Sequence, residues 1–180
     1  IPFFFASSKL VGIGHGTDKA LVAGLLGMRP DDIRIPTSFE LAKKNGMEFS
    51  FSTVTLKDAH PNTAVLRLTG QHGRKIEVQA ASIGGGRILI AKLDGIDVNF
   101  SAEKPTLIVH NVDQPGHVAQ VTTMLAEKQV NIATLQLYRD KRGGYAVMVI
   151  ETDQEVPEES VTWLEQLDGI IKVTYINVEE

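Results

Sequence analysis

The feature that most restricts the possible folds is a six-element pattern that follows a short polar linker at 101–105. Four of its segments have the apolar character of strands, and in the other two apolar residues recur at helical spacing. The predicted order is strand, helix, strand, strand, helix, strand, at 106–111, 115–129, 131–139, 145–151, 157–167 and 171–177. This order is the ferredoxin-like βαββαβ layout, with both helices on one face of a four-stranded antiparallel sheet.

The residues before the linker follow a different pattern. Helices are expected first, at 19–28 and 36–45, and strands follow at 47–55, 64–69, 75–81, 88–93 and 96–100. Turn residues between the later strands predict hairpins and a largely antiparallel sheet. We therefore predict an α+β chain of two domains, at 1–102 and 104–180.

Composition excludes several classes of protein. The net charge of −4 and the lack of a basic stripe argue against a nucleic-acid partner, and no apolar run is long enough to span a membrane. The apolar start at 1–6 is too short for a signal peptide and lacks a basic lead, so a cytoplasmic location is expected. Because cysteine is absent, the chain has no disulfides, no thiol nucleophile and no thiolates for an iron–sulfur cluster.

A glycine-rich stretch at 12–18 is the first candidate site. Three glycines in five residues let the backbone bend sharply, and Thr17 or Asp18 is a natural N-cap for the apolar helix that follows. The free N–H groups of such a helix attract an anion, and His15 stands directly before them. Two interpretations remain open, a small-anion site and a tight turn into a core helix.

Two later loops have similar chemistry. The loop at 58–63 carries His60 and Asn62 beside a proline, and the stretch at 82–86 reads Ser-Ile-Gly-Gly-Gly. A glycine cluster can form an anion-binding nest of N–H groups, although it is more often a bend. His15 and His60 lack a third ligand at a recognisable spacing, so no metal site is predicted. The glycines also fail to match the dinucleotide-binding fingerprint.

The second domain carries a motif of its own. Its first strand leads into Asn111-Val-Asp-Gln-Pro-Gly-His117, and its first helix leads into Val-Asn131-Ile-Ala. With the βαββαβ order, these residues resemble the ACT domain, a regulatory module that binds amino acids at a dimer interface. The resemblance implies a homodimer and these effector contacts: Asn111, Asp113, Gly116, His117 and Asn131. An ACT fold that serves only to build a dimer is the alternative.

Taken in order, the three loops and the ACT motif resemble the beta subunit of iron–sulfur-dependent L-serine dehydratase. The resemblance implies a cytoplasmic lyase, inactive alone, that deaminates L-serine to pyruvate and ammonia with a 4Fe–4S cluster held by an alpha subunit. It implies His15 and His60 as proton-handling or substrate-orienting catalytic residues. The implied substrate-binding residues are Thr17, Asn62, Ser82, Gly84, Gly85 and Gly86.

A second resemblance gives a different function. The first domain is also similar to the allosteric substrate-binding domain beside the ACT domain of some phosphoglycerate dehydrogenases. That resemblance implies a non-catalytic module that binds an anion and transmits a signal.

Three further expectations concern single positions. The dehydratase family carries a Ser-Ser-His-Thr type motif before its glycine loop; Ser7 and Ser8 are not followed by histidine, so we expect an incomplete first domain. The helical spacing of Trp163 predicts a core position. His110 is expected to face either the helices or solvent.

Overall fold

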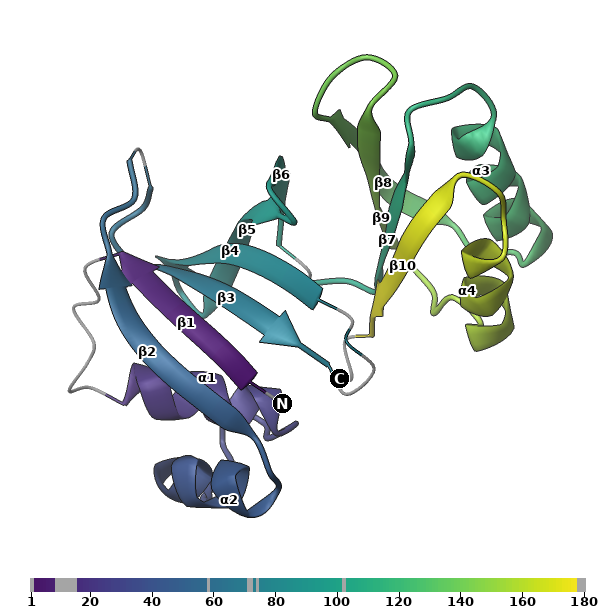
Figure 1. The fold of residues 1–180 in the computed structure, drawn as a ribbon. Helices are drawn as coiled ribbons and strands as arrows, with labels where there is room; N and C mark the ends of the chain where they lie inside the picture. The colour runs from purple at the N-terminus through teal and green to yellow at the C-terminus, as the bar shows by residue number, and fades with distance from the viewer. Residues whose placement is uncertain are drawn as a thin grey trace. The chain divides into compact units, whose positions relative to one another are not determined.

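A computed structural model describes residues 2–8, 16–57, 59–70, 73, 75–101 and 103–177. The chain divides into two compact units, 1–95 and 96–180 (Figure 1). This division by contacts falls in the β-turn at Asp94–Gly95, a few residues before the predicted linker. No helix in these ranges is long and apolar enough to cross a membrane.

The helices of the first unit follow the predicted order with shifted ends. They are α1 (Thr17–Leu25), a 3₁₀ turn η1 (Ile35–Thr37) and α2 (Ser38–Lys44). The predicted second helix is therefore split, with Pro36 in its 3₁₀ part. Helix α1 starts and stops earlier than predicted because Gly16 and Gly27 have φ values of 85° and 77°, outside the helical region.

A mixed sheet forms the rest of the first unit. Its strands are β1 (Pro2–Ser8), β2 (Glu48–Val54), β3 (Thr63–Thr69), β4 (Lys75–Gly84) and β5 (Arg87–Leu93), in the sheet order β2-β1-β3-β4-β5. Strand β6 (Ile96–Phe100) falls in the second unit. Strand β1 precedes the helices, so the expectation that helices come first is wrong. Strands β1 and β2 are parallel, whereas the pairs β1–β3, β3–β4 and β4–β5 are antiparallel. The helices pack on the sheet through buried Val22 and Ala42, against Phe49, Phe51 and Leu66.

The second unit has the predicted βαββαβ order. Its elements are β7 (Thr106–Val112), α3 (His117–Glu127), β8 (Ile132–Arg139), β9 (Tyr145–Thr152), α4 (Glu158–Glu165) and β10 (Ile170–Ile176). The strand order is β10-β7-β9-β8, and α3 and α4 lie on one face of this sheet (Figure 1). The α+β fold class is confirmed.

The core of the second unit lies between that face and the two helices. Its fully buried members include Leu107, Val109, Val121, Leu125, Met148, Ile150 and Leu164. Strands β7 and β9 are buried along nearly their whole length, which explains why their sequences are apolar runs rather than alternating patterns.

Trp163 does not join this core: its side chain is 43% exposed, so the predicted core position is wrong. His110, for which two environments were open, is buried.

Candidate functional site

Two of the three predicted loops meet at one edge of the first sheet. Thr63 at the start of β3 pairs with Ala81 near the end of β4, and the backbone N–H of Ser82 donates to the carbonyl of Asn62 at 3.1 Å. The loop of His60 and the end of β4 are therefore neighbours although about 20 residues separate them in sequence. This antiparallel register brings His60, Asn62 and Ser82 to the same edge.

Hydrogen bonds hold the turn of His60 in a defined shape. The N–H of Asn62 donates to His60 Nδ1 at 3.2 Å, and Thr63 Oγ1 donates to the His60 carbonyl at 2.6 Å. Because Nδ1 accepts a hydrogen bond, the neutral ring carries its proton on Nε2. The residue is exposed, while Thr63 is buried and anchors the turn. His60 thus presents an oriented imidazole at the surface of this edge.

The glycines at 84–86 form a tight hairpin turn. Gly84 pairs with Arg87, so Gly85 and Gly86 are the two residues of the loop between β4 and β5. Their φ values are 64° and 76°, and two-residue type I′ turns require positive φ at both positions. The turn therefore explains the glycines, and their role in substrate binding stays a prediction. Ser82 is exposed beside this turn.

The first glycine-rich loop is only partly described. His15 lies outside the described residues, whereas Gly16 is the N-cap of α1 and Thr17 is its first residue. The expected N-cap at Thr17 or Asp18 is wrong, because left-handed Gly16 ends the turn one residue earlier and no side chain caps the helix. Ser7 of β1 pairs with Ala64 of β3, so the chain leaves β1 at the edge where His60 and Ser82 lie.

In the second unit, Asn111 near the end of β7 and His117 at the start of α3 are both buried. Asn111 Nδ2 donates to the Val112 carbonyl at 2.7 Å, and His117 Nδ1 lies 3.2 Å from Gln120 Oε1. Asn111 Oδ1 and His117 Nε2 are buried without a hydrogen-bond partner among the described residues. Two buried polar atoms left free in this way are unusual, and they mark this end of the sheet as a place where a polar ligand gains hydrogen bonds.

The loop between β7 and α3 has two contacts that the sequence analysis missed. Asp113 Oδ2 accepts from the N–H of Gly143 at 2.9 Å and from Arg139 Nη1 at 3.4 Å. The carboxylate thereby ties the loop to the β8–β9 turn. Gly116 has a φ of 107°, which explains why α3 begins at His117 rather than at Pro115.

Asn131 lies at the opposite end of the same sheet. Strands β7 and β8 both pair antiparallel with β9, so they run in one direction; Asn131 precedes β8, whereas Asp113 follows β7. Seven residues of strand separate the two ends by about 20 Å. Within one chain, the structure therefore does not bring Asn131 together with Asn111, Asp113, Gly116 and His117.

The side chain of Asn131 belongs to a polar cluster at its own end. Its Nδ2 donates to Asp153 Oδ2 at 2.7 Å, and Lys104 Nζ donates to the other oxygen of Asp153 at 2.8 Å. The hydrogen bond from Lys104, followed by that from Asn131, lowers the pKa of Asp153 below its ordinary value. Asn131 thus lies beside a carboxylate that stays charged at neutral pH.

These features define the class of protein: an α+β domain joined to a ferredoxin-like βαββαβ domain. Residues 105–169 match the ACT domain family. Two relatives are each 34% identical to this chain. The match to the probable L-serine dehydratase beta chain of Bacillus subtilis covers 96% of this chain and 78% of the relative. The match to the L-serine dehydratase beta chain of Peptoniphilus asaccharolyticus covers 92% of this chain and 75% of the relative. The chain belongs to the L-serine dehydratase beta-chain family.

A second group of relatives matches the chain at lower identity. The D-3-phosphoglycerate dehydrogenase of Bacillus subtilis is 26% identical over 89% of this chain, which spans only 30% of that relative.

Proposed function

We propose that this chain is a subunit that supplies substrate-binding and proton-handling residues for deamination of L-serine to pyruvate and ammonia. The observation that carries the proposal is the sheet edge where oriented His60 lies with Asn62 and Ser82, in a chain 34% identical to L-serine dehydratase beta chains over nearly its whole length. His15 and Thr17 are proposed as further members on the basis of sequence.

The reaction requires removal of the α-proton of serine and departure of its β-hydroxyl. A neutral His60 with Nδ1 already accepting a hydrogen bond has Nε2–H to offer, which suits it to donate to the departing hydroxyl or to orient the substrate. The hydroxyl of Ser82 and the amide of Asn62 supply polar contacts for the carboxylate. The exposed glycine turn beside them adds backbone N–H groups.

The proposed 4Fe–4S cluster belongs to a partner alpha chain. This chain contains no cysteine, and among the described residues no three metal-ligating side chains are grouped together. Its donor set therefore does not fit such a cluster, which would require thiolate ligands. In this proposal the beta chain contributes side chains and amides to a centre completed by its partner.

The ACT domain is proposed to sense L-serine in a homodimer. The loop residues Asn111, Asp113, Gly116 and His117 lie at one end of the sheet and Asn131 at the other, so one site requires two copies of the chain. Asn111 Oδ1 and His117 Nε2, which are buried and have no hydrogen-bond partner in the described part of the chain, supply an acceptor and a ring nitrogen for the effector. Serine held there would favour one arrangement of the paired chains.

Reconstitution tests the catalytic proposal. The chain is mixed with a cluster-bearing alpha chain, and pyruvate release from L-serine is measured for the native chain, for His60→Gln and for a control, Lys43→Gln, at an exposed position of α2. We expect His60→Gln to lower kcat by about 10²- to 10⁴-fold, the usual loss when a proton-transfer group is removed. The control should retain activity. Equal activity of all three chains would contradict the role of His60.

A non-catalytic regulatory module is the second candidate. The observation that favours it is the match of both domains to a phosphoglycerate dehydrogenase. This candidate predicts serine or anion binding by the chain and no pyruvate when the reconstituted alpha chain is present. The same assay therefore separates the two functions.

A further inference from the structure

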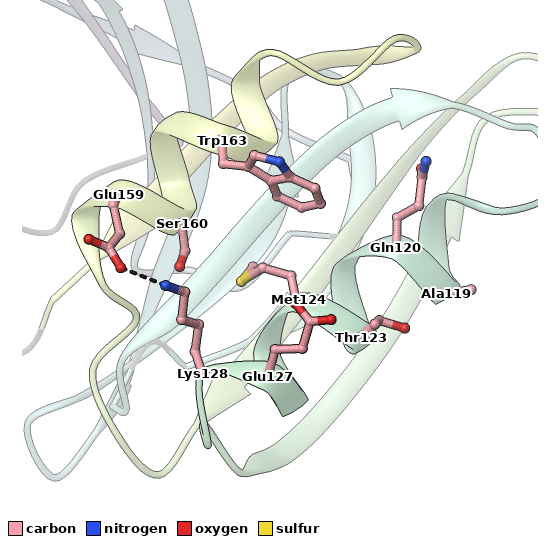
Figure 2. A pocket seen from close by; sticks show the side chains of 9 residues that line it. All are labelled: Ala119, Gln120, Thr123, Met124, Glu127, Lys128, Glu159, Ser160 and Trp163. Atoms are coloured by element: carbon pink, nitrogen blue, oxygen red, sulfur yellow. Dashed lines mark hydrogen bonds and ion pairs between the residues drawn. The ribbon is translucent and has the colours of Figure 1, made fainter.

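Helices α3 and α4 form a groove whose lining includes none of the proposed catalytic or effector residues. Its cavity of about 640 Å³ is lined by residues of both helices (Figure 2). Gln120 is the lining residue nearest to the proposed effector site, since its Oε1 lies 3.2 Å from His117 Nδ1. Pockets of about 300–1,000 Å³ are typical for small organic ligands. The groove is therefore large enough for one small molecule.

The floor and wall of the groove combine an apolar surface with a buried hydroxyl. Met124 and Ser160 are 5% and 1% exposed, whereas the indole of Trp163 is 43% exposed and extends over the groove in Figure 2. The Ser160 Oγ atom is buried and has no hydrogen-bond partner in the described part of the chain. An unpaired buried hydroxyl and an exposed indole both gain from a ligand that covers them.

The rim of the groove carries more negative than positive charge. Lys128 Nζ forms an ion pair with Glu159 Oε1 at 2.6 Å, so these two charges largely compensate each other. Glu127, which also lines the groove, is exposed and makes no ion pair with another described residue. The rim therefore repels an organic anion and attracts a cation, and the face of an indole also attracts cations.

From this arrangement we propose that the α3–α4 groove binds an organic ammonium ion. Its apolar body packs on Met124 and Trp163, and its ammonium group is held on the Glu127 side of the rim. The same ammonium group donates a hydrogen bond to the Ser160 hydroxyl when the groove is filled. The small volume and the charged rim favour such a ligand over a second copy of the chain.

The chain's single tryptophan is Trp163, so its fluorescence reports on this groove directly. The full chain is titrated with three probes of similar shape: 2-phenylethylammonium, neutral 2-phenylethanol and anionic 3-phenylpropionate. We expect a saturable fluorescence change with the ammonium probe and at least tenfold weaker binding of the anion. No saturable change, or binding of the anion as tight as that of the ammonium, would overturn the proposal.

Variants separate a specific site from general attraction to an acidic chain. Glu127→Gln is expected to weaken the ammonium probe about three- to fivefold, the effect of one partly exposed charge. Its matched control, Glu158→Gln on α4, removes the same charge outside the groove and should leave the affinity unchanged. Equal losses in both variants would overturn the proposal.

The remaining outcomes concern Ser160 and a second copy of the chain. Ser160→Ala should weaken the probe, measured by calorimetry, while leaving the thermal unfolding temperature unchanged or higher. Unchanged affinity in this variant would overturn the role of the hydroxyl.

Affinity for the ammonium probe that falls as the chain concentration rises would show that a second copy of the chain covers the groove instead.

Discussion

At the scale of single residues, one contact organises the loop end of the second unit. Gly169 has a φ of 79°, and a Cβ atom placed there would lie 2.6 Å from His117 Nε2. Its carbonyl also accepts from the N–H of Val112, next to Asn111. Only glycine lets the backbone at 169 lie this close to the His117 ring, so Gly169 fixes the position of that ring.

Gly169→Ala is expected to lower the free energy of unfolding by about 2–4 kcal/mol, because it combines a strained backbone with a steric clash. Gly143→Ala is the matched control, since Gly143 has a φ of 71° but a Cβ atom added there would meet no other atom within 4 Å. The control should lose only about 1 kcal/mol. Urea unfolding followed by circular dichroism measures both, and equal losses would show that the His117 contact contributes nothing.

At the scale of elements, the hairpin of β4 and β5 depends on its two-residue turn. Strand β4 continues to Gly84 and β5 begins at Arg87, so the turn contains only two residues. Ser82 lies on the last part of β4, and its distance from the His60 turn follows from the register of β3 with β4. A change in the turn is therefore transmitted to the proposed catalytic edge.

Gly86→Ala is expected to destabilise the chain by about 1 kcal/mol, because alanine is disfavoured at a φ of 76°. Gly24→Ala in α1 is the opposite case: Gly24 has no positive φ and open space around it. That variant should stabilise the chain by about 0.5–1 kcal/mol through helix propensity. Denaturant unfolding tests the pair, and a shift of the same sign in both variants would contradict the assigned turn.

The polar cluster of Lys104, Asp153 and Asn131 joins the ends of three elements and predicts a pH dependence. Since the pKa of Asp153 is lowered in the folded chain, its stabilising effect is complete above the unfolded pKa near 3.9 and is lost as the pH falls from there through the lower pKa of the folded chain. Asp153→Asn should therefore lower the thermal unfolding temperature slightly at pH 7, and this difference should shrink as the pH falls below about 3.9. The effect is small because the pair is exposed. A difference that does not shrink with falling pH would contradict the ion pair.

At the scale of the whole molecule, the proposed effector site requires two chains. One copy supplies the loop after β7 and the other supplies Asn131, because the two lie about 20 Å apart within a single chain. In this proposal a complete site therefore forms only where two copies face each other.

Complementation between variants tests this arrangement. Asn131→Ala and Asp113→Asn, each studied alone, should weaken serine binding in calorimetry. Mixed in equal amounts after subunit exchange, they should recover native affinity at about half of the sites in the mixed dimers, since one site then holds both native halves. No recovery on mixing would place each site within one chain.

The sequence by itself determined the order and type of nearly all the elements. The apolar pattern at 106–177 predicted the βαββαβ unit to within a few residues, because a helix needs apolar side chains at a set spacing and a buried strand needs a short apolar run. Errors in the ends of helices came from glycines such as Gly16 and Gly116, whose left-handed φ values become visible only in the folded backbone.

Tertiary structure decided which distant residues became neighbours. The β3–β4 register brought His60 beside Ser82, and the β7–β9–β8 register separated Asn131 from Asp113. Helical spacing suggested a buried Trp163, but the position of α4 on the sheet leaves its indole exposed over a groove. Local patterns cannot specify these relations, because they depend on strand register and helix packing between segments far apart in the chain.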